Sequence, residues 1–565
     1  MSDLLYEPLK YYEKEGREKH KENVQAFFEE LKTRSGVDTA QNKKTVTKYN
    51  EQLAKVQRLE KKLGRKKGLR VFLIVCAVIG VLLAIYGALE DPLFLAIGIP
   101  VTVLSLLWIF LGLNKQIKNF ATILETERNE AKRLLDTAWA EMAPLNALFK
   151  ERDAIDLVEK TLPEMDFDEF YSAERERELR ELCGYAPKAD ENRSVLDTLS
   201  GEYKENPFLF ERHLIHRMGE EVYHGYLTIS WTERYRDGNG NLRTRRRTQT
   251  LHASVTKPKP FYSEDTVLKY FPQGAPDLSF TREGLYHDDK SDKQIERMVK
   301  KGEKKLKKKA QEALEAGKSF TEMNNTEFEV LFDALNRDNE VQFRMMFTPL
   351  AQNNMVDLMR SEAGYGDDFD FYKQKRMSVI HSDHAQTWKM QASVDNYLSY
   401  DFEVIQKNFQ SFNEEYFKSV FFDFAPLLAV PMYQDKPVKS LEPLKEYKVN
   451  YTANEYESLA NRMDLAAFCA KGSKTRAILK ASGVSHTDDL DRVEIRAYSY
   501  RTESKTDLIP VFGGDGRTHL VPVPWIEYIP VNRTSYVDVR KRRADDGGDL
   551  TRSHGLLAKF FGYQN

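Results

Sequence analysis

Cysteine is scarce in this sequence, since only Cys76, Cys183 and Cys469 occur among 565 residues. Three isolated thiols exclude a disulfide framework and a four-cysteine zinc site, and they are typical of a reducing compartment. An excess of one charge is also missing, because 85 basic side chains stand against 87 acidic ones. Any attraction to nucleic acid or lipid must therefore come from local patches.

Complete catalytic motifs are absent as well. The sequence contains no Gly-x-x-x-x-Gly-Lys-Ser/Thr loop, no Gly-x-Ser-x-Gly and no His-Glu-x-x-His. The run at 513–516 resembles a nucleotide-cyclase signature, but the residues after it do not fit, so we expect a turn. His381, Asp383 and His384 form the best group of potential metal ligands and lack a further spaced ligand. We predict no catalytic residue, no metal and no cofactor.

Two long uncharged hydrophobic runs are the strongest feature present, at residues 71–89 and 93–113. At about 1.5 Å per residue, each run is long enough to cross a hydrocarbon core of about 30 Å. The first run starts too far from the N-terminus for a cleavable signal peptide. We therefore predict two transmembrane helices; the alternative is a buried hairpin in a soluble protein.

The residues around these runs predict an orientation. Only residues 90–92 separate the runs, so we expect an antiparallel hairpin, in which Gly80 and Ala84 allow close approach of the helices. No Asp, Glu, Lys, Arg or His lies inside either run, which argues against transport by this chain alone. Basic residues flank the runs and are missing from the turn. We therefore expect a cell-membrane protein whose two termini both lie in the cytoplasm. These flanking residues are Arg58, Lys61, Lys62, Arg65, Lys66, Lys67, Arg70, Lys115 and Lys118.

Apolar residues at helical spacing continue on both sides of the hairpin, from Val46 to Leu63 and from Ile117 to Leu148. Such stripes need a partner, and the hairpin places them side by side. We predict a coiled-coil stalk over residues 36–160; docking of the stripes on a globular part is the alternative. A separate helix is expected within residues 1–35, with a break at Gly36 and Val37.

Residues 161–430 are expected to form a cytoplasmic α+β domain. Gly225, Leu227, Ile229 and Trp231 alternate on one face of an expected strand, and residues 251–255 do so on the returning strand. These sets face each other only if the loop near 237–240 holds an odd number of residues. Pro258 and Pro260 are expected to end the returning strand.

Two basic segments in this domain are candidate contacts for a polyanion. The first lies on the returning strand, and the second is an expected lysine-rich helix at 293–317 that stops at Gly317. A solvated helix face is the alternative for the lysines. The candidate residues are Arg243, Arg245, Arg246, Arg247, Lys300, Lys301, Lys304, Lys305 and Lys308.

The most distinctive motifs follow, between residues 325 and 371. Thr348-Pro349 is expected to start a helix, because proline has no amide proton to lose at that position. Arg337, Asp338, Glu340 and Arg344 are predicted to form a surface ion-pair set; a binding role for Arg344 is the alternative.

The order of these motifs resembles a bacterial family of two-span membrane proteins with a cytoplasmic domain of unknown function (domain of unknown function 3137). The resemblance covers roughly residues 1–400 and lies in the long N-terminal helix, the hairpin, the arginine-rich strand and the segment around Thr348-Pro349. It implies strands at 325–332 and around Arg344, and another strand at 368–371. It implies no catalytic residues.

Residues 431–565 are predicted to form a second α+β region with a mobile tail at 540–552. The aromatic run at 412–424 is expected in a core. We expect a helix at 456–468 that 475–480 continues, a strand at 493–497, and strands at 520–529 and 536–539.

The predicted fold class is therefore α+β, in which a helical stalk and membrane hairpin precede domains of antiparallel sheet and helix. We predict a membrane-anchored cytoplasmic scaffold or adaptor rather than an enzyme. Its predicted partners are the lipid bilayer, a cytoplasmic protein, a second copy of the chain, and an anionic lipid or nucleic acid. Two alternatives stay open: a membrane-tethered module for polyanions, and an enzyme with an unrecognised pocket.

Overall fold

A computed structural model describes residues 6–89, 92–186, 190–236, 238, 240–284, 292–317, 320–361, 363–387, 393–435, 451–487, 490–540 and 559–560. The fold is α+β, as predicted. The chain divides into two compact units that differ from the predicted segments. Unit 1 comprises residues 1–21, 151–392 and 414–565, and unit 2 comprises residues 22–150 and 393–413.

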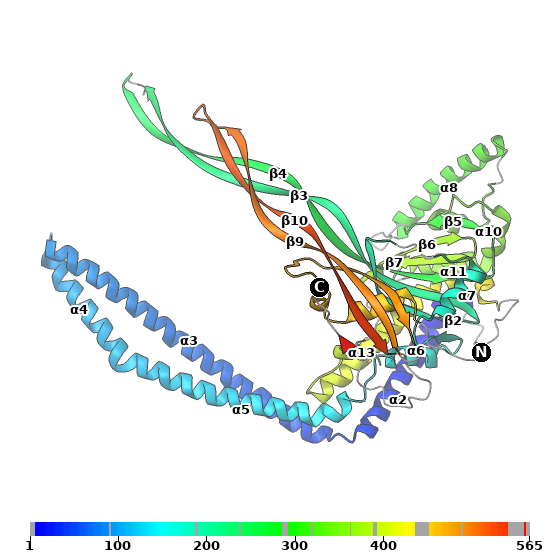
Figure 1. The fold of residues 1–565 in the computed structure, drawn as a ribbon, viewed down its shortest axis with the longest axis horizontal. Helices are drawn as coiled ribbons and strands as arrows, with labels where there is room; N and C mark the ends of the chain where they lie inside the picture. The colour runs from blue at the N-terminus through cyan, green and yellow to red at the C-terminus, as the bar shows by residue number, and fades with distance from the viewer. Residues whose placement is uncertain are drawn as a thin grey trace. The chain divides into compact units, whose positions relative to one another are not determined.

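Unit 2 consists mainly of long helices. Gly36, with a φ of +62°, separates α2 from α3, which confirms the expected break. The two hydrophobic runs lie on α3 and on α4 with its continuation η3, and Figure 1 shows α3 running beside α4 and α5. The main helices are α2 (Arg17–Ser35), α3 (Thr39–Leu89), α4 (Pro92–Trp108), η3 (Ile109–Leu113) and α5 (Asn114–Asn146).

The apolar runs pack closely at small residues and leave large side chains exposed. A Cβ on Gly98 would lie 2.6 Å from the carbonyl oxygen of Gly80 and 2.6 Å from the nitrogen of Ala84, so the predicted close approach is confirmed. Phe72 is 62% exposed and Phe110 is 72% exposed. Both helices are long and apolar enough to cross a membrane.

Beyond the runs, α3 and α5 pack against each other. Their buried side chains form one cluster. It extends from Val56 to Leu73 on α3 and from Ile109 to Ala131 on η3 and α5. The pairing ends before the predicted residue 160. Helix α5 stops at Asn146, after Pro144, and the next helix, α6 (Asp153–Thr161), belongs to unit 1.

Unit 1 is built on two antiparallel sheets. The larger has the strand order β1-β2-β3-β4-β7-β6-β5, and the smaller has the order β11-β10-β9-β8. The strands of the larger sheet are β1 (Met165–Phe167), β2 (Arg193–Tyr203), β3 (Asn206–Arg236), β4 (Leu242–Tyr270), β5 (Ser279–Arg282), β6 (Phe369–Gln374) and β7 (Met377–Ser382). Those of the smaller sheet are β8 (Ile478–His486), β9 (Leu490–Phe512), β10 (Thr518–Arg540) and β11 (Lys559–Phe560).

Helices cover both faces of the larger sheet. On one face, Phe424 of α13 (Phe402–Leu428) packs edge-on against Phe208 at 5.0 Å between ring centroids, which confirms that the aromatic run at 412–424 is core. On the other face, Leu209 packs with Leu179 of α7 (Ala173–Cys183). Helix α14 (Ala453–Arg462) lies on this second face, where Asn454 contacts Glu211.

Strands β3, β4, β9 and β10 extend far beyond the sheets as two long hairpins (Figure 1). We call residues 216–262 and 499–531 the arm. The first hairpin pairs Leu227 with Leu251 and closes at Arg236 and Leu242, so its loop holds five residues and the predicted odd count is confirmed. Its apolar face packs on Val521 and Val523 of the second hairpin.

The prediction that Pro258 and Pro260 end the returning strand is wrong. Both prolines lie inside β4, opposite Glu220 and Met218. Alternate residues of an antiparallel strand direct their amides away from the partner, so a proline there costs no ladder hydrogen bond. Strand β7 pairs with β4 only at residues 268–270, so the outer edge at the prolines has no paired strand in the described part of the chain.

The strands implied by the family resemblance between 325 and 347 are also wrong. Asn325 and Asn339 each accept an amide hydrogen bond at a helix start, at Phe328 and Gln342. Thr348 caps the next helix as predicted, and the strand implied at 368–371 is present as β6. The helices of this part are α8 (Asp292–Glu315), α9 (Thr326–Phe332), α10 (Glu340–Met346), α11 (Pro349–Arg360) and α12 (Asp383–Thr387).

The C-terminal region departs from prediction in two places. Residues 478–486 form strand β8 and do not continue helix α14, while 520–529 and 536–539 belong to the single strand β10. The turn at 513–516 is confirmed. The predicted mobile tail, apart from Arg540, lies outside the described residues.

Candidate functional site

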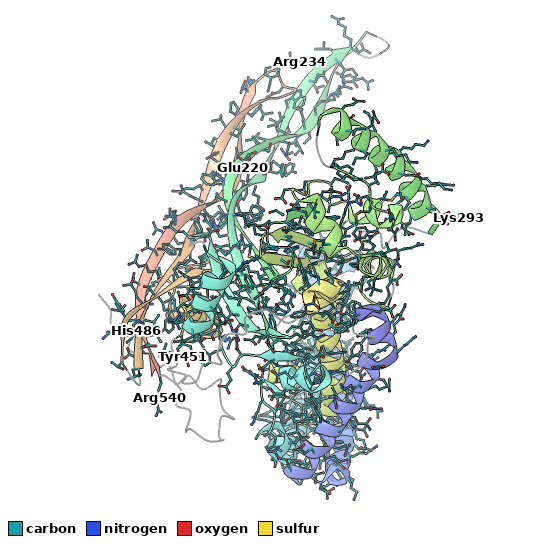
Figure 2. All side chains as sticks on the ribbon, turned by 90° about the vertical axis from the view of Figure 1, so that its right-hand side faces the viewer. Glu220, Arg234, Lys293, Tyr451, His486 and Arg540 are labelled. Carbon is teal, nitrogen blue, oxygen red and sulfur yellow. The ribbon has the colours of Figure 1, made fainter. Side chains whose placement is uncertain are left out.

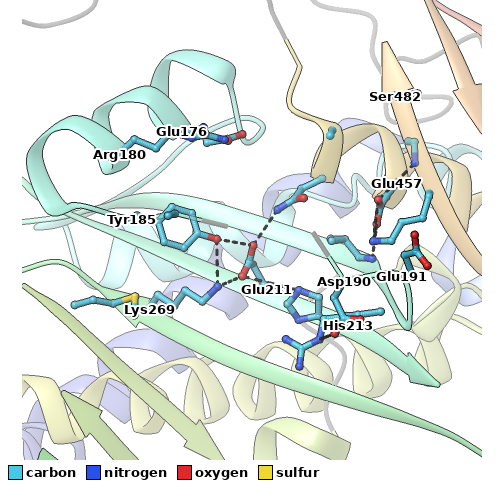
Figure 3. A pocket seen from close by; sticks show the side chains of 18 of the residues that line it. Glu176, Arg180, Tyr185, Asp190, Glu191, Glu211, His213, Lys269, Glu457 and Ser482 are labelled. Carbon is cyan, nitrogen blue, oxygen red and sulfur yellow. Dashed lines mark hydrogen bonds and ion pairs between the residues drawn. The ribbon is translucent and has the colours of Figure 1, made fainter. Parts of the chain in front are cut away.

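A cavity of about 1190 Å³ lies in unit 1, on the sheet face that carries α7 and α14. Its floor is formed by β2, β3 and β4, and its walls include α7, α14, β8 and β9. Ionisable side chains from several of these elements converge on it (Figure 3). Convergent polar groups in a large cavity are typical of a binding site.

The centre of the cavity floor is Glu211, which is 2% exposed. Its carboxylate accepts hydrogen bonds from Lys269 Nζ, from Tyr185 Oη at 3.2 Å and from Asn454 Nδ2 at 3.0 Å. Burial opposes its ionisation, but the charge of Lys269 and the hydrogen bonds from Lys269 and Tyr185 outweigh that effect and lower the pKa of Glu211. The carboxylate is therefore charged and fully hydrogen-bonded.

A second buried carboxylate, Glu457 of α14, is satisfied in the same way. It accepts hydrogen bonds from the amide of Val195 at 3.0 Å, from the amide of Ala481 at 3.4 Å and from Lys480 Nζ at 3.3 Å. Burial raises the pKa of Glu457, against the opposing effect of Lys480. This carboxylate ties α14 to β2 and β8 and closes one wall of the cavity.

His213 lies beside Glu211 and is less well satisfied. Its Nε2 is 3.9 Å from Glu211 Oε2, beyond hydrogen-bond distance. Burial lowers the pKa of His213 to about 4, so the imidazole is neutral at pH 7. Cys183 on the opposite wall is also unsuited to catalysis, because burial raises the pKa of its thiol to about 12 and the nucleophilic thiolate does not form. The arrangement favours binding over covalent chemistry.

His381 and His384, the best group of potential metal ligands in the sequence, are paired with separate carboxylates. His381 Nε2 is 2.8 Å from Asp265 Oδ1, whereas His384 Nδ1 is 2.6 Å from Asp368 Oδ2. Asp383 begins helix α12. Within the described ranges, no group of three or more His, Cys, Asp or Glu side chains is arranged to hold a metal ion.

The ion pairs of His381 predict a pH dependence of stability. The hydrogen bond that His381 donates to Asp265, together with the carboxylate of Asp370 at 3.6 Å, raises the pKa of His381 to about 10, from an ordinary value of 6.5. A raised pKa in the folded state stabilises the fold below pH 6.5, and this contribution is lost as the pH rises towards 10. We expect the free energy of unfolding of unit 1 to fall over this range, and His381→Gln to flatten the fall, as measured by urea unfolding. An unchanged slope in the variant would contradict the assignment.

The sequence-predicted basic residues lie outside this cavity. Arg243, Arg245, Arg246 and Arg247 are exposed near the end of the arm, where Arg245 and Arg247 both donate to Glu233 at 2.8 Å. The candidate lysines of α8, at 300, 301, 304, 305 and 308, are exposed, while Ile295, Leu306 and Ala313 of the same helix are buried. Figure 2 shows Arg234 near the end of the arm and Lys293 on α8, in separate parts of unit 1.

The predicted ion pairs of Glu340 with Arg337 and with Arg344 are present, but the Arg337 side chain is buried and not on the surface. Arg337 and Glu329 are each 1% exposed and form an ion pair, and Arg337 Nε lies 2.7 Å from Glu340 Oε2. Arg344 lies 3.5 Å from Glu340 and donates to the carbonyl of Glu322. These contacts give Arg344 a structural role in joining α10 to the preceding loop.

Sequence reasoning missed the cavity residues, because they come from segments that are distant in the sequence. One local signal was present: Glu211 and His213 lie on the same face of β3, in the stretch 207–215, in which Arg212 is the one other charged residue. Charged residues on a strand buried on both faces require partners. No family model, no curated protein and no solved structure matches this chain.

Proposed function

We propose that this chain is a membrane-anchored cytoplasmic scaffold or adaptor and that the arm is the part that holds its partner. Membrane anchoring is supported by the exposure of the two apolar helices, since only 17% and 22% of their most apolar windows are buried. The core helix of a soluble protein would be mostly buried. The basic flanks of the helices favour a cytoplasmic location for both termini.

The proposed role is supported mainly by the exposed apolar side chains of the arm. Its outer surfaces leave large apolar side chains in solvent, including Tyr226 at 64% and Phe512 at 70% exposure. Most of its length pairs only within the two hairpins, and its own core is the small cluster around Val521. A long extension with exposed aromatic residues is typical of an interaction surface.

Photo-crosslinking in the native membrane tests this role. A photoreactive amino acid in place of Tyr226 is expected to give one dominant covalent adduct with a second protein. The matched control replaces Leu314 of α8, which is 74% exposed and lies outside the arm, and it should not give that adduct. Equal adducts at both positions, or none at Tyr226, would count against the arm as the partner site.

Protease added outside intact cells tests the topology separately. Residues 114–565 are expected to remain intact, because a hairpin with cytoplasmic basic flanks leaves only the short turn at 90–92 outside. Digestion of this large portion in unbroken cells would exclude the proposed orientation. Lysed cells serve as the control, in which the same protease should cut the chain.

A second candidate function is binding of a polyanion by the end of the arm. Residues 230–250 contain six arginines against Glu233 and Asp237. Replacing Arg243, Arg245, Arg246 and Arg247 by Gln should weaken binding to an anionic vesicle or a DNA duplex and flatten its salt dependence, by about 0.9 in log–log slope per lost phosphate contact on DNA. Replacing Lys300, Lys301, Lys304 and Lys305 of α8 is the charge-matched comparison. An unchanged salt slope in the arginine variant would eliminate this function.

A further inference from the structure

One end of the cavity contains two buried nitrogen atoms that lack a hydrogen-bond partner among the described residues, Nδ1 of His213 and Nε of Arg193. The His213 side chain is only 6% exposed. Val195 lies opposite His213 across β2 and β3, and Arg193 lies opposite Ile215. Arg193 and His213 are therefore diagonal neighbours on the same sheet face, within reach of one ligand.

The other buried charges of the cavity are already compensated. Lys269 pairs with Glu211, and Lys480 pairs with Glu457. Arg193, by contrast, has only a weak ion pair among the described residues. Its Nε lies 4.0 Å from Asp190 Oδ2, which is the limit for an ion pair. The two atoms without a partner are a guanidinium N–H and a ring nitrogen that is able to donate, so an acceptor would satisfy both. Asp265, which lies opposite His213 on β4, already accepts a hydrogen bond from His381.

We propose that Arg193 and His213 bind the phosphate or carboxylate group of a small polar molecule. The guanidinium presents two parallel N–H groups that match the oxygens of either anion. His213 donates from Nδ1 in the tautomer that carries the proton there, which its long distance to Glu211 leaves accessible.

The rest of the cavity defines the body of this ligand. A volume of about 1190 Å³ exceeds that of a single inorganic anion, so the cavity has room for a body attached to it. Tyr185, Asn454, Ser482 and Tyr498 line this space with hydroxyl and amide groups. A phosphate ester or a carboxylic acid whose body carries hydroxyl groups therefore fits better than an apolar anion. This site is independent of the arm and of the proposed scaffold role.

Nuclear magnetic resonance of the full chain in maltoside micelles tests the proposal with inorganic phosphate and with acetate as separate probes. Saturable broadening of the phosphate ³¹P line supports a phosphate ligand, and saturation transfer to acetate alone supports a carboxylate ligand. Arg193→Gln is expected to weaken binding of the positive probe by at least about tenfold, because it removes a charge-assisted hydrogen bond. His213→Gln should weaken it in the same direction.

Arg496→Gln is the matched control. Arg496 also lines the cavity, but it already pairs with Glu494 at 2.6 Å, so affinity should stay within about twofold of the wild type. Circular dichroism verifies that each variant is folded; Arg193 is 40% exposed, so its replacement should not unfold the chain. Absence of saturable binding of both probes, or equal affinity in folded Arg193→Gln and wild type, would overturn the proposal.

Discussion

Replacing Arg282 by methionine is expected to lower the free energy of unfolding of unit 1 by about 3–5 kcal/mol. Arg282 of β5 forms an ion pair with Asp367, and both side chains are 0% exposed. The guanidinium also donates to the carbonyl of Phe369 and lies 4.3 Å from the centroid of that ring. Methionine fills similar space but leaves the carboxylate of Asp367 buried without its charged partner.

Urea unfolding of the full chain in maltoside micelles, followed by hydrogen exchange of the β5 and β6 amides, measures this effect. Arg344→Met is the matched control, because Arg344 is 39% exposed, and its effect should stay below about 1 kcal/mol. The double variant Arg282→Met with Asp367→Asn should recover part of the loss, since it removes the uncompensated charge. A single variant as stable as the wild type would show that the pair is not buried as described.

Replacing Gly225 by valine is expected to separate the two hairpins of the arm. A Cβ at this position would lie 2.2 Å from the carbonyl oxygen of Pro522 and 2.8 Å from the Cα of Val523. Both are backbone atoms, so they cannot move aside as a side chain can, and overpacking of this kind costs about 1–3 kcal/mol. The loss falls on the cluster around Val521, in which apolar side chains of the two hairpins pack together.

A zero-length coupling reaction between amine and carboxylate reports this separation. Lys257 Nζ of the first hairpin is 2.7 Å from Asp507 Oδ2 of the second, so carbodiimide should join them in the wild type and not in Gly225→Val. Gly219→Val is the control, because the nearest atoms to its Cβ belong to the ring of Phe261, a 46% exposed side chain that can rotate away. Coupling of equal yield in Gly225→Val would contradict the close packing.

Local patterns in the sequence predicted the elements that depend on neighbouring residues. The helices at 71–113 follow from long apolar runs, the hairpin around Gly238 from turn residues between alternating strands, and the helix start at Thr348-Pro349 from capping chemistry. Each of these signals lies within about thirty residues. The odd loop length of the first hairpin was also predictable, because side chains alternate with a period of exactly two.

The features that sequence reasoning missed depend on distant residues. Strand pairing brings Arg193 next to His213, and α14 adds Asn454 and Glu457 from more than two hundred positions away. The error at 325–347 has another cause: a short aromatic run is compatible with either a strand or a helix, and the asparagine caps at its ends decide for the helix. Such caps were visible in the sequence at Asn325 and Asn339.

The prolines within the arm have a consequence for its outer strand edges. The second hairpin also contains prolines, at Pro510, Pro522, Pro524 and Pro530. Like Pro258 and Pro260 of β4, they all occupy even-numbered positions, which alternate along each strand with the odd-numbered ones. Each removes an outward amide that a second chain would need for strand addition. Two copies of this chain whose arms meet edge to edge therefore lack the amides needed to join their hairpins into one continuous sheet at these positions.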